Sequence, residues 1–271
     1  MGYLQLAGID PMRTASTLRG FPPFMANLRA LRRAASSESA TQQSDWPITR
    51  LSPCLTDRFE ESGVASGHYF HQDLLVAQHI FSRQPESHFD VGSRVDGFVA
   101  HVASFRKIEV LDIRPLKSTV PNMSFRVCDL MSPLPVELNR LCDSLSCLHA
   151  LEHLGLGRYG DPVQPNGHVT GLANLHRILR DDGTLYLSVP MGPQRIEFDA
   201  HRVFALPKLL ELVGIGFVVS EFSYVNDAGD LARDVSLEAD PEAVANNFGC
   251  RYGCAILTLR KRPLEGRSWP T

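Results

Sequence analysis

The sequence predicts an α/β fold, in which a mostly parallel sheet carries helices on both of its faces. Short apolar runs of strand length alternate with segments whose apolar residues recur at helical spacing. Glycine, proline and aspartate stand between these runs, so turns are expected there. Several runs also end on an acid or another polar residue, as parallel strands do at a ligand-binding edge.

The central stretch, residues 88–112, has the pattern strand, turn, helix, strand. An apolar run ends near Asp90, a turn bearing Gly92 and Gly97 follows, and a second apolar run closes on Asp112. A right-handed crossover would put the turn at the carboxyl end of the first strand. We expect the two glycines to leave room for a ligand. We expect Asp112 to lie where such folds bind ribose hydroxyls.

The same patterns predict the remaining elements of the sheet and its helices. Further strands are predicted at 124–128, 141–148, 184–189, 217–224 and 255–260, and helices at 72–81, 169–179 and 206–213. Asp181 to Gly183 is predicted to end the second of these helices in a turn. With the two strands of the central stretch, these runs make seven strands.

Composition narrows the class of protein. The chain has 271 residues, 44% apolar and 21% charged, which is typical of a soluble globular protein. A net charge of −3 argues against a dedicated nucleic-acid binder. No apolar run approaches the roughly 20 residues that cross a bilayer, and no secretory signal opens the chain, so a cytoplasmic location is expected. The spacing of Cys250 and Cys254 is not that of a zinc knuckle, and no metal site is predicted.

Residues 1–50 read as a basic arm ahead of a domain at 51–271. The arm has six arginines against three acids. A break is predicted at Gly20 to Pro23, then a short helix at Phe24 to Ala35 and a flexible linker at 36–45. The arm is interpreted either as a packed or solvated appendage or as a docking element for an anionic membrane face or a partner protein.

Polar side chains follow each of the first four predicted strands. They are Asp90, Asp112, Asp129, and Ser146 with His149. Three carboxylates at one edge would repel one another unless hydrogen-bond donors lay between them. An adenosine supplies such donors through its ribose diol and its amino group, so this edge is predicted to bind one.

The successive segments DVGSRVDG, VLDIRP, RVCDL, SLSCLHALEHL and LRDDGTLYLSVP resemble the motifs of class I S-adenosylmethionine-dependent methyltransferases. The resemblance covers about residues 65–262. It implies a Rossmann-like, mostly parallel seven-stranded sheet with an antiparallel terminal hairpin. The segments GHYFHQD, DVGSRVDGFVAH, LHALEHLGLGRYGDP and FDAHRVF more narrowly resemble a bacterial group described only as a domain of unknown function, whose members often accompany glycan-assembly enzymes.

This resemblance implies a set of residues around the cofactor S-adenosyl-L-methionine. The family usually carries three alternating glycines in the first turn, whereas here Arg94 and Asp96 replace the second and third. Gly97 stands one residue beyond the position of the family's third glycine. The residues implied to contact methionine, ribose, adenine and the methyl-donor side are Asp90, Gly92, Ser93, Arg94, Gly97, Asp112, Ile113, Asp129, Leu130 and Ser146.

Methyl transfer to a hydroxyl requires alignment of donor and acceptor and removal of one proton. Histidine is the usual base near neutral pH. His201 is the favoured candidate, because Asp199 could orient it and the resemblance puts this segment beside the acceptor. The other candidates are His149 and His153, with Glu152 as a second orienting carboxylate. A metal held by the two histidines with Asp161 or Asp199 is an alternative that we do not predict.

Acceptor contacts are expected from two segments. They are Tyr69 and His71 in GHYFHQD, and Arg158, Tyr159 and Asp161 in the glycine-rich loop. The predicted activity is O-methylation of a saccharide or similar polyhydroxy molecule. Two alternatives stay open: a nicotinamide-dependent oxidoreductase, although the turn lacks GxGxxG, and a non-catalytic scaffold of the same fold. The oligomeric state is left open.

Overall fold

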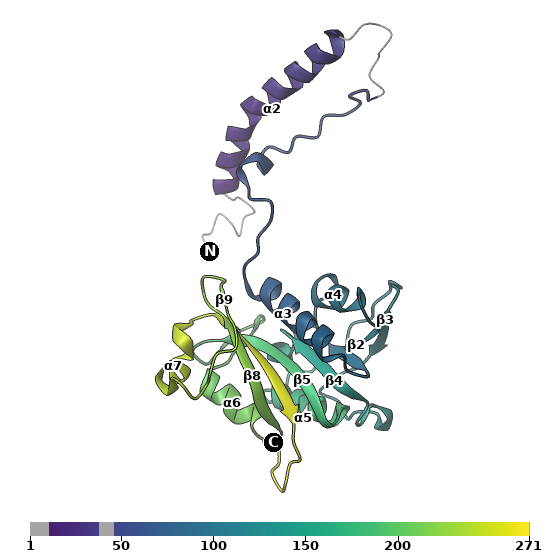
Figure 1. The fold of residues 1–271 in the computed structure, drawn as a ribbon, viewed down its shortest axis with the longest axis vertical. Helices are drawn as coiled ribbons and strands as arrows, with labels where there is room; N and C mark the ends of the chain where they lie inside the picture. Colours follow the sequence, from purple (N-terminus) through teal and green to yellow (C-terminus); the bar gives the residue numbers. More distant parts are fainter. Residues whose placement is uncertain (1–10, 38–45, 271) are drawn as a thin grey trace. The chain divides into compact units, whose positions relative to one another are not determined.

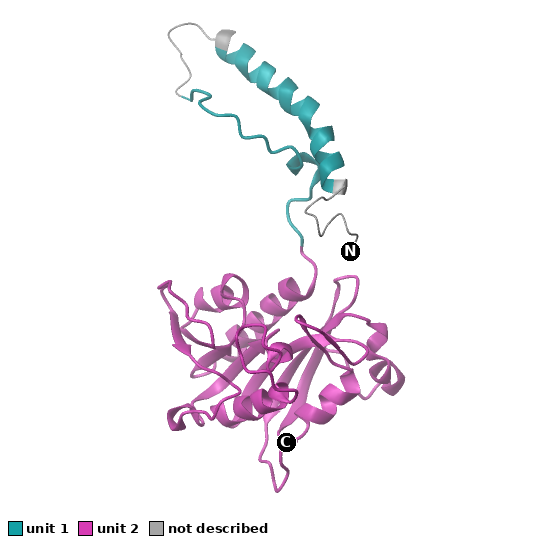
Figure 2. Ribbon diagram, turned by 180° about the vertical axis from the view of Figure 1, so that it is seen from behind, with its two compact units in different colours: residues 1–64 teal, residues 65–271 magenta. Residues whose placement is uncertain are grey.

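The computed structural model describes residues 11–37 and 46–270 (Figure 1). Contacts divide the chain into two units, Met1–Val64 and Ala65–Thr271 (Figure 2). The arm predicted at residues 1–50 lies within the first unit, which extends to residue 64. The start of the second predicted domain at residue 51 stays a prediction.

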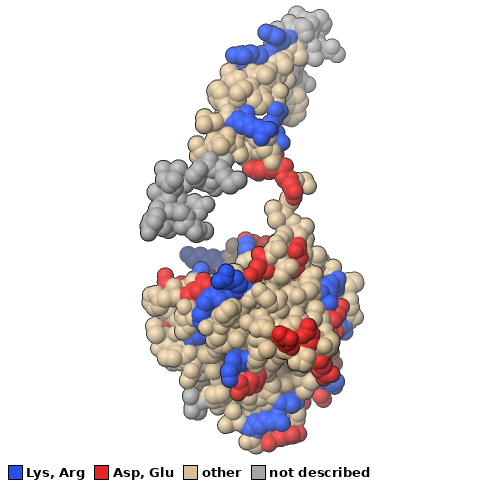
Figure 3. All heavy atoms as spheres, turned by 90° about the vertical axis from the view of Figure 1, so that its left-hand side faces the viewer, with Lys and Arg blue, Asp and Glu red and all other residues tan. Residues whose placement is uncertain are grey.

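The first unit contains one long helix, α2 (Pro11–Ser37), and a 3-10 turn, η1 (Asp57–Phe59). The break predicted at Gly20 to Pro23 is wrong, because the helix runs through Pro22 and Pro23. Proline fixes φ near −65°, which is a helical value, but each of these two residues lacks the N–H that would donate to the carbonyl four residues earlier. Arginines gather along this helix (Figure 3). The predicted linker lies outside the described residues at 38–45, and its first two residues end the helix.

The second unit is built on an eight-stranded sheet with the order β3-β2-β1-β4-β5-β10-β8-β9. Its strands are β1 (His88–Val91), β2 (Ile108–Asp112), β3 (Met123–Val127), β4 (Cys142–Leu148), β5 (Leu179–Met191), β8 (Phe217–Val225), β9 (Leu231–Ala232) and β10 (Gly253–Lys261). The five neighbouring strands β3, β2, β1, β4 and β5 are parallel. Strand β10 runs antiparallel between β5 and β8. The predicted Rossmann-like sheet with an antiparallel end is therefore confirmed. It has one more strand than predicted, since β9 pairs with the end of β8.

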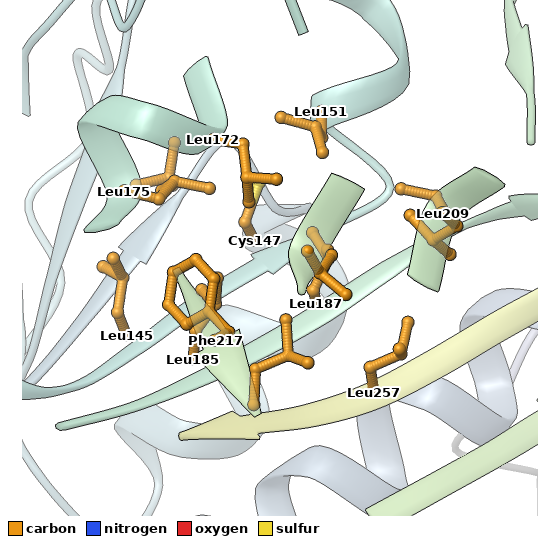
Figure 4. Close-up of a cluster of buried hydrophobic side chains, with 14 of the residues drawn as sticks. Leu145, Cys147, Leu151, Leu172, Leu175, Leu185, Leu187, Leu209, Phe217 and Leu257 are labelled. Carbon is orange, nitrogen blue, oxygen red and sulfur yellow. The ribbon is translucent and has the colours of Figure 1, made fainter. Parts of the chain in front are cut away.

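Helices cover both faces of the sheet, as predicted. One apolar cluster joins α5 (Gly167–Ile178) and α6 (Leu206–Val213) to the strands (Figure 4). A second cluster joins the other face to α3 (His68–Arg83), the π-helical turn η2 (Val95–Val99) and α4 (Ala100–Ala103). The remaining elements are η3 (Val136–Leu138), η4 (Leu151–His153), α7 (Pro241–Ala245), η5 (Asn247–Gly249) and a separate hairpin of β6 (Arg195–Glu197) and β7 (His201–Val203).

The segment Asp181 to Gly183 differs from its prediction. It does not form a turn ahead of β5, because β5 already begins at Leu179. Cys142 and Ser144 of β4 pair with Leu179 and Thr184, so the residues between those two partners bulge out of the ladder. The register of the β4–β5 pairing shifts between these two pairs, as it does across a β-bulge.

Two features of the topology matter for function. β1 lies between β2 and β4, so the chain reverses its direction of growth across the sheet at β1. In open α/β sheets, ligands bind beyond the carboxyl ends of the strands at such a reversal. Within residues 11–37 and 46–270, no helix has the length and apolar character needed to cross a bilayer.

Candidate functional site

A cavity of about 500 Å³ opens beyond the carboxyl ends of β1, β2 and β4, at this reversal. A smaller cavity of about 70 Å³ adjoins it, toward the ends of β2 and β3. The two share part of their walls, so they form one continuous site. The shared residues are Gly92, Asp112, Arg114, His149, His153 and Tyr159.

Most of the residues predicted from the sequence line this site. The larger cavity is lined by Tyr69, Gly92, Ser93, Arg94, Asp112, His149, Glu152, His153, Arg158, Tyr159 and His201. The smaller cavity adds Ile113, Asp129, Leu130 and Asp161. Five predicted residues line neither cavity: Asp90, Gly97, Ser146, His71 and Asp199.

The glycines of the first turn serve the fold more directly than a ligand. Gly92 has φ +68°, a value that L side chains rarely adopt, and a Cβ there would lie 2.9 Å from the Cβ of Ala150. A Cβ on Gly97 would lie 2.5 Å from the Asp73 carboxylate of α3. The expected reason for Gly97, space for a ligand, is therefore replaced by close packing against α3. Gly92 still borders both cavities.

Asp90 lies beneath the site, not in its wall. Its buried carboxylate accepts hydrogen bonds from the Ser93 backbone N–H (3.0 Å), the Ser93 hydroxyl (2.6 Å) and the Ser146 hydroxyl (2.5 Å). Burial raises the pKa of Asp90 to about 6 despite these donors. Ser93 in turn accepts a hydrogen bond from the Leu148 backbone N–H, so this network holds the ends of β1 and β4 together.

The carboxylates at the strand ends already have donors from their own chain. Asp112 accepts hydrogen bonds from the Arg114 backbone N–H (2.8 Å), Nε (3.1 Å) and Nη2 (2.8 Å). Asp129 accepts from the Met131 backbone N–H (2.9 Å) and the Ser132 hydroxyl (2.7 Å). The argument that only an adenosine could reconcile these acids is therefore wrong, although Asp112 and Asp129 do border the cavities.

Beyond β4, Glu152 lies in the turn η4, with His149 on one side and His153 on the other. Its Oε1 accepts a hydrogen bond from Nδ1 of His149 (2.7 Å) and lies 3.8 Å from Nε2 of His153. Nδ1 of His153 donates to the Ala200 carbonyl oxygen (2.7 Å), which leaves Nε2 as the proton acceptor of the neutral ring. Burial lowers the pKa of His153, so this ring is neutral at neutral pH.

His201 has a different partner from the one predicted. Glu197 lies directly opposite His201 in the β6–β7 hairpin, and its Oε2 is 3.6 Å from Nε2 of His201. Asp199 lies exposed in the turn of that hairpin with φ +62°. Asp199 therefore does not orient His201, because directly opposed residues share a face of an antiparallel pair and the turn residue does not.

The expected acceptor residues divide into two groups. Tyr69 packs on the His149 ring at 5.1 Å, and Tyr159 lies under the guanidinium groups of Arg114 (4.4 Å) and Arg158 (5.2 Å). Asp161 borders the smaller cavity, but its carboxylate accepts from three backbone N–H groups of the 155–159 loop and so organises that loop. His71 makes an edge contact with Phe70 outside both cavities.

Several residues of the site were not predicted. Arg114 and Tyr252 line the larger cavity, and His68 stacks on His149 with a ring separation of 5.3 Å. The segment GHYFHQD did signal a site at the start of α3, but its first histidine, not His71, faces inward. Nothing in the local sequence marks Tyr252, which reaches the site because β10 inserts between β5 and β8.

Comparison with known proteins gives one family match. The family described as "Caenorhabditis protein of unknown function, DUF268" matches residues 136–243. This match covers less than half of the chain and runs from η3 to α7. The expected group of unknown function is thus supported, but the matching family carries a Caenorhabditis description and not a bacterial one. A search of curated proteins gave no match.

Solved structures resemble the chain at low sequence identity. The N-methyltransferase NodS from Bradyrhizobium japonicum WM9, in complex with S-adenosylhomocysteine, is 11% identical, with a TM-score of 0.47, over 73% of this chain and 89% of its own. The Burkholderia thailandensis 1,6-didemethyltoxoflavin-N1-methyltransferase, with 1,6-didemethyltoxoflavin and S-adenosylhomocysteine bound, is 17% identical, with a TM-score of 0.47, over 94% and 92%. At these values neither structure assigns an activity, so function is argued from the site.

Proposed function

We propose that this chain is a methyltransferase that uses S-adenosyl-L-methionine as its methyl donor. The observation that carries the proposal is the continuous site at the reversal of the sheet. It runs from Asp112 and Asp129 at one end to Glu152 and the histidines at the other. Its larger cavity, about 500 Å³, falls in the range of ~300–1,000 Å³ that binds small molecules.

The end of the site near β2 and β3 suits the adenosine of the donor. A carboxylate that follows the second strand, here Asp112, can accept hydrogen bonds from both ribose hydroxyls. Ile113 and Leu130 offer apolar contact to a flat base, and Asp129 can accept a hydrogen bond from its amino group. The methionine portion would then lie toward Ser93 and Gly92.

The other end suits a polar acceptor with an exchangeable proton. Tyr69, Tyr159 and Tyr252 give flat apolar faces, while Arg158 and the histidines give hydrogen-bonding groups. This mixture fits a saccharide or another polyhydroxy molecule, and we propose a hydroxyl of such a molecule as the acceptor. The choice of acceptor is argued from these side chains alone.

We assign the general base to His153 and not to His201. His153 borders both cavities, at the point where donor and acceptor would meet, whereas His201 borders only the larger one. S-adenosyl-L-methionine would supply the methyl group, and Nε2 of His153 would accept the proton of the hydroxyl that receives it. Glu152, 3.8 Å away, stabilises the imidazolium that forms.

Cofactor titration by calorimetry tests the proposal. S-adenosylhomocysteine is expected to bind and NADH is not. Replacing Asp112 with Asn is expected to weaken S-adenosylhomocysteine binding about 10- to 150-fold, as for hydrogen bonds to a charged group worth ~1.5–3 kcal/mol. The matched control is Asp182→Asn, which removes an exposed carboxylate from the bulge of β5.

Two other results would each point to a rival function. Binding of NADH in place of S-adenosylhomocysteine would indicate an oxidoreductase. Binding of S-adenosylhomocysteine with no methyl transfer from labelled donor to polyhydroxy acceptors would indicate a non-catalytic protein of this fold. For the basic arm at residues 1–50, both a packed or solvated appendage and a docking element stay open, and sedimentation with anionic vesicles would test docking to a membrane.

A further inference from the structure

Three side chains from distant parts of the sequence converge beside the larger cavity. They are His68 at the start of α3, His149 directly after β4, and Cys254 in β10. Each offers one nitrogen or sulfur atom, and these three atoms lie within 4.8 Å of one another. Among the residues that the structure describes, no other group of three histidine, cysteine or acidic side chains converges in this way.

His149 has a buried nitrogen that lacks a partner. Its Nδ1 donates to Glu152, because a carboxylate can only accept, and in the neutral ring Nε2 would be an acceptor. The residue is 8% exposed, and within the described chain Nε2 makes no hydrogen bond. A buried polar atom without a partner costs about 1–3 kcal/mol. A cation at this position would satisfy it.

The surroundings of His149 are those of a fixed metal ligand. A metal-bound histidine almost always donates its second nitrogen to a carboxylate or carbonyl, which sets the tautomer and the ring orientation. Glu152 does this for His149 at 2.7 Å. The His149 backbone is also held at φ +51°, and its N–H donates to the Ser188 carbonyl oxygen at 3.0 Å. Strained backbone of this kind is concentrated at functional sites.

We propose that His68, His149 and Cys254 bind a zinc ion. Imidazole nitrogen and thiolate sulfur are the ligands that zinc prefers, at about 2.0–2.3 Å. Three atoms within 4.8 Å of one another leave a point no farther than about 2.8 Å from each, so movements of under about 1 Å complete the site. Burial of the thiol fits this assignment, since Cys254 is fully buried.

Three protein ligands leave a fourth position of a tetrahedral ion for water or a substrate. Of the three ligands, His149 lines the larger cavity and His68 and Cys254 line neither, so that position would reach the cavity on the His149 side. An oxygen bound to zinc loses its proton near neutral pH. The metal would therefore hold a hydroxyl or water at the acceptor end, although the site itself does not depend on the methyltransferase assignment.

A different chemistry could use some of the same residues. Cys254, His149 and Glu152 are also the types found in a nucleophile, base and carboxylate triad. The thiol of Cys254 is fully buried and lies 3.8 Å from the side-chain oxygen of Gln72 and 3.7 Å from the Ala255 carbonyl oxygen. A nucleophile must reach its substrate, so burial favours the metal.

The test uses the full chain, stripped of metal with a chelator and then given zinc or cobalt(II). One zinc per chain is expected to remain after desalting, and cobalt(II) is expected to give a thiolate-to-cobalt absorption band. Cys254→Ser should abolish that band, whereas Cys250→Ser, a buried control four residues away, should keep it. Likewise His68→Gln should lose zinc, and His71→Gln on the same helix should keep it.

Glu152→Gln keeps all three ligands, so zinc should bind with an affinity reduced about 10- to 100-fold. No retained zinc in the unaltered protein, or equal retention in the His68 and His71 variants, would overturn the proposal. Circular dichroism shows whether each variant is still folded. If Cys254→Ser unfolds, the comparison of zinc retention between His68→Gln and His71→Gln tests the site. S-adenosylhomocysteine titration of the metal-free protein is a separate readout, so failure of the zinc site and failure of the proposed activity are distinguishable.

Discussion

The backbone and the side chain of Arg114 both donate hydrogen bonds to the carboxylate of Asp112. Three nitrogen atoms of Arg114 lie 2.8–3.1 Å from the two carboxylate oxygens. The same guanidinium lies 4.4 Å from the centre of the Tyr159 ring. A ribose diol that binds Asp112 would have to share these oxygens with Arg114, so the two would compete.

Replacing Arg114 with Gln should therefore tighten cofactor binding. Half of the Arg114 side chain is exposed, and an exposed ion pair is worth about 0.2–1 kcal/mol. The expected gain in S-adenosylhomocysteine affinity is up to about 5-fold, measured by calorimetry. Arg180→Gln is the control, because Arg180 pairs with Glu86 away from the cavities. Weaker binding in Arg114→Gln would mean that Arg114 holds the cofactor.

The assignment of His153 as the base gives a prediction for pH dependence. The pKa of His153 is lowered below its usual value of about 6.5, with burial as the largest cause. The neutral ring is the active form, so kcat/KM should rise with pH and level off once pH exceeds this lowered pKa. His153→Gln should remove the acid limb of the profile and reduce turnover about 10²–10⁴-fold.

The matched control for His153 is His71→Gln, since His71 lies outside both cavities. It should keep the full rate and the same pH profile. Affinity for S-adenosylhomocysteine should be unchanged in both variants. A profile in His153→Gln that still shows the acid limb would assign the proton to another group, and His201→Gln would then be measured.

The sheet could be predicted because strand and helix periods are strong where side chains are buried on one or both faces. The same patterns put Asp112 and Asp129 at strand ends, and the structure has them there. The neighbours of those carboxylates could not be predicted. Arg114 turns back onto Asp112 through rotations about side-chain bonds, which periodicity does not record. The register of the β6–β7 hairpin, which brings Glu197 and not Asp199 to His201, is likewise set by pairing across the turn.

The role of Gly97 is tested by adding one methyl group. Gly97→Ala would put a Cβ 2.5 Å from the Asp73 carboxylate, so overpacking should destabilise the protein by about 1–3 kcal/mol. The free energy of unfolding in urea measures this cost. In Gly97→Ala/Asp73→Ala the clash is absent, so the double variant should lose less than the sum of the two single losses. Additive losses, or a loss of S-adenosylhomocysteine affinity confined to Gly97→Ala, would return Gly97 to the role of a ligand-facing glycine.

Asp90 should make stability depend on pH in an unusual direction. Its pKa rises from 3.8 to about 6 on folding, chiefly because the carboxylate is fully buried. The folded protein therefore holds the Asp90 proton more tightly than the unfolded chain does. Between about pH 3.8 and 6 this group alone should lower stability as pH increases, by at most about 3 kcal/mol.

Asp90→Asn removes this titration and keeps the shape of the side chain. Its amide oxygen can still accept from the Ser93 backbone N–H, and its amide nitrogen can donate to a serine hydroxyl. Other groups titrate in the same range, so the measured quantity is the difference in unfolding free energy between the two proteins from pH 4 to pH 7. That difference should shift in favour of Asp90→Asn as pH increases. Parallel curves would mean that Asp90 ionises as easily in the fold as in the unfolded chain, and that the serine hydroxyls fully offset its burial.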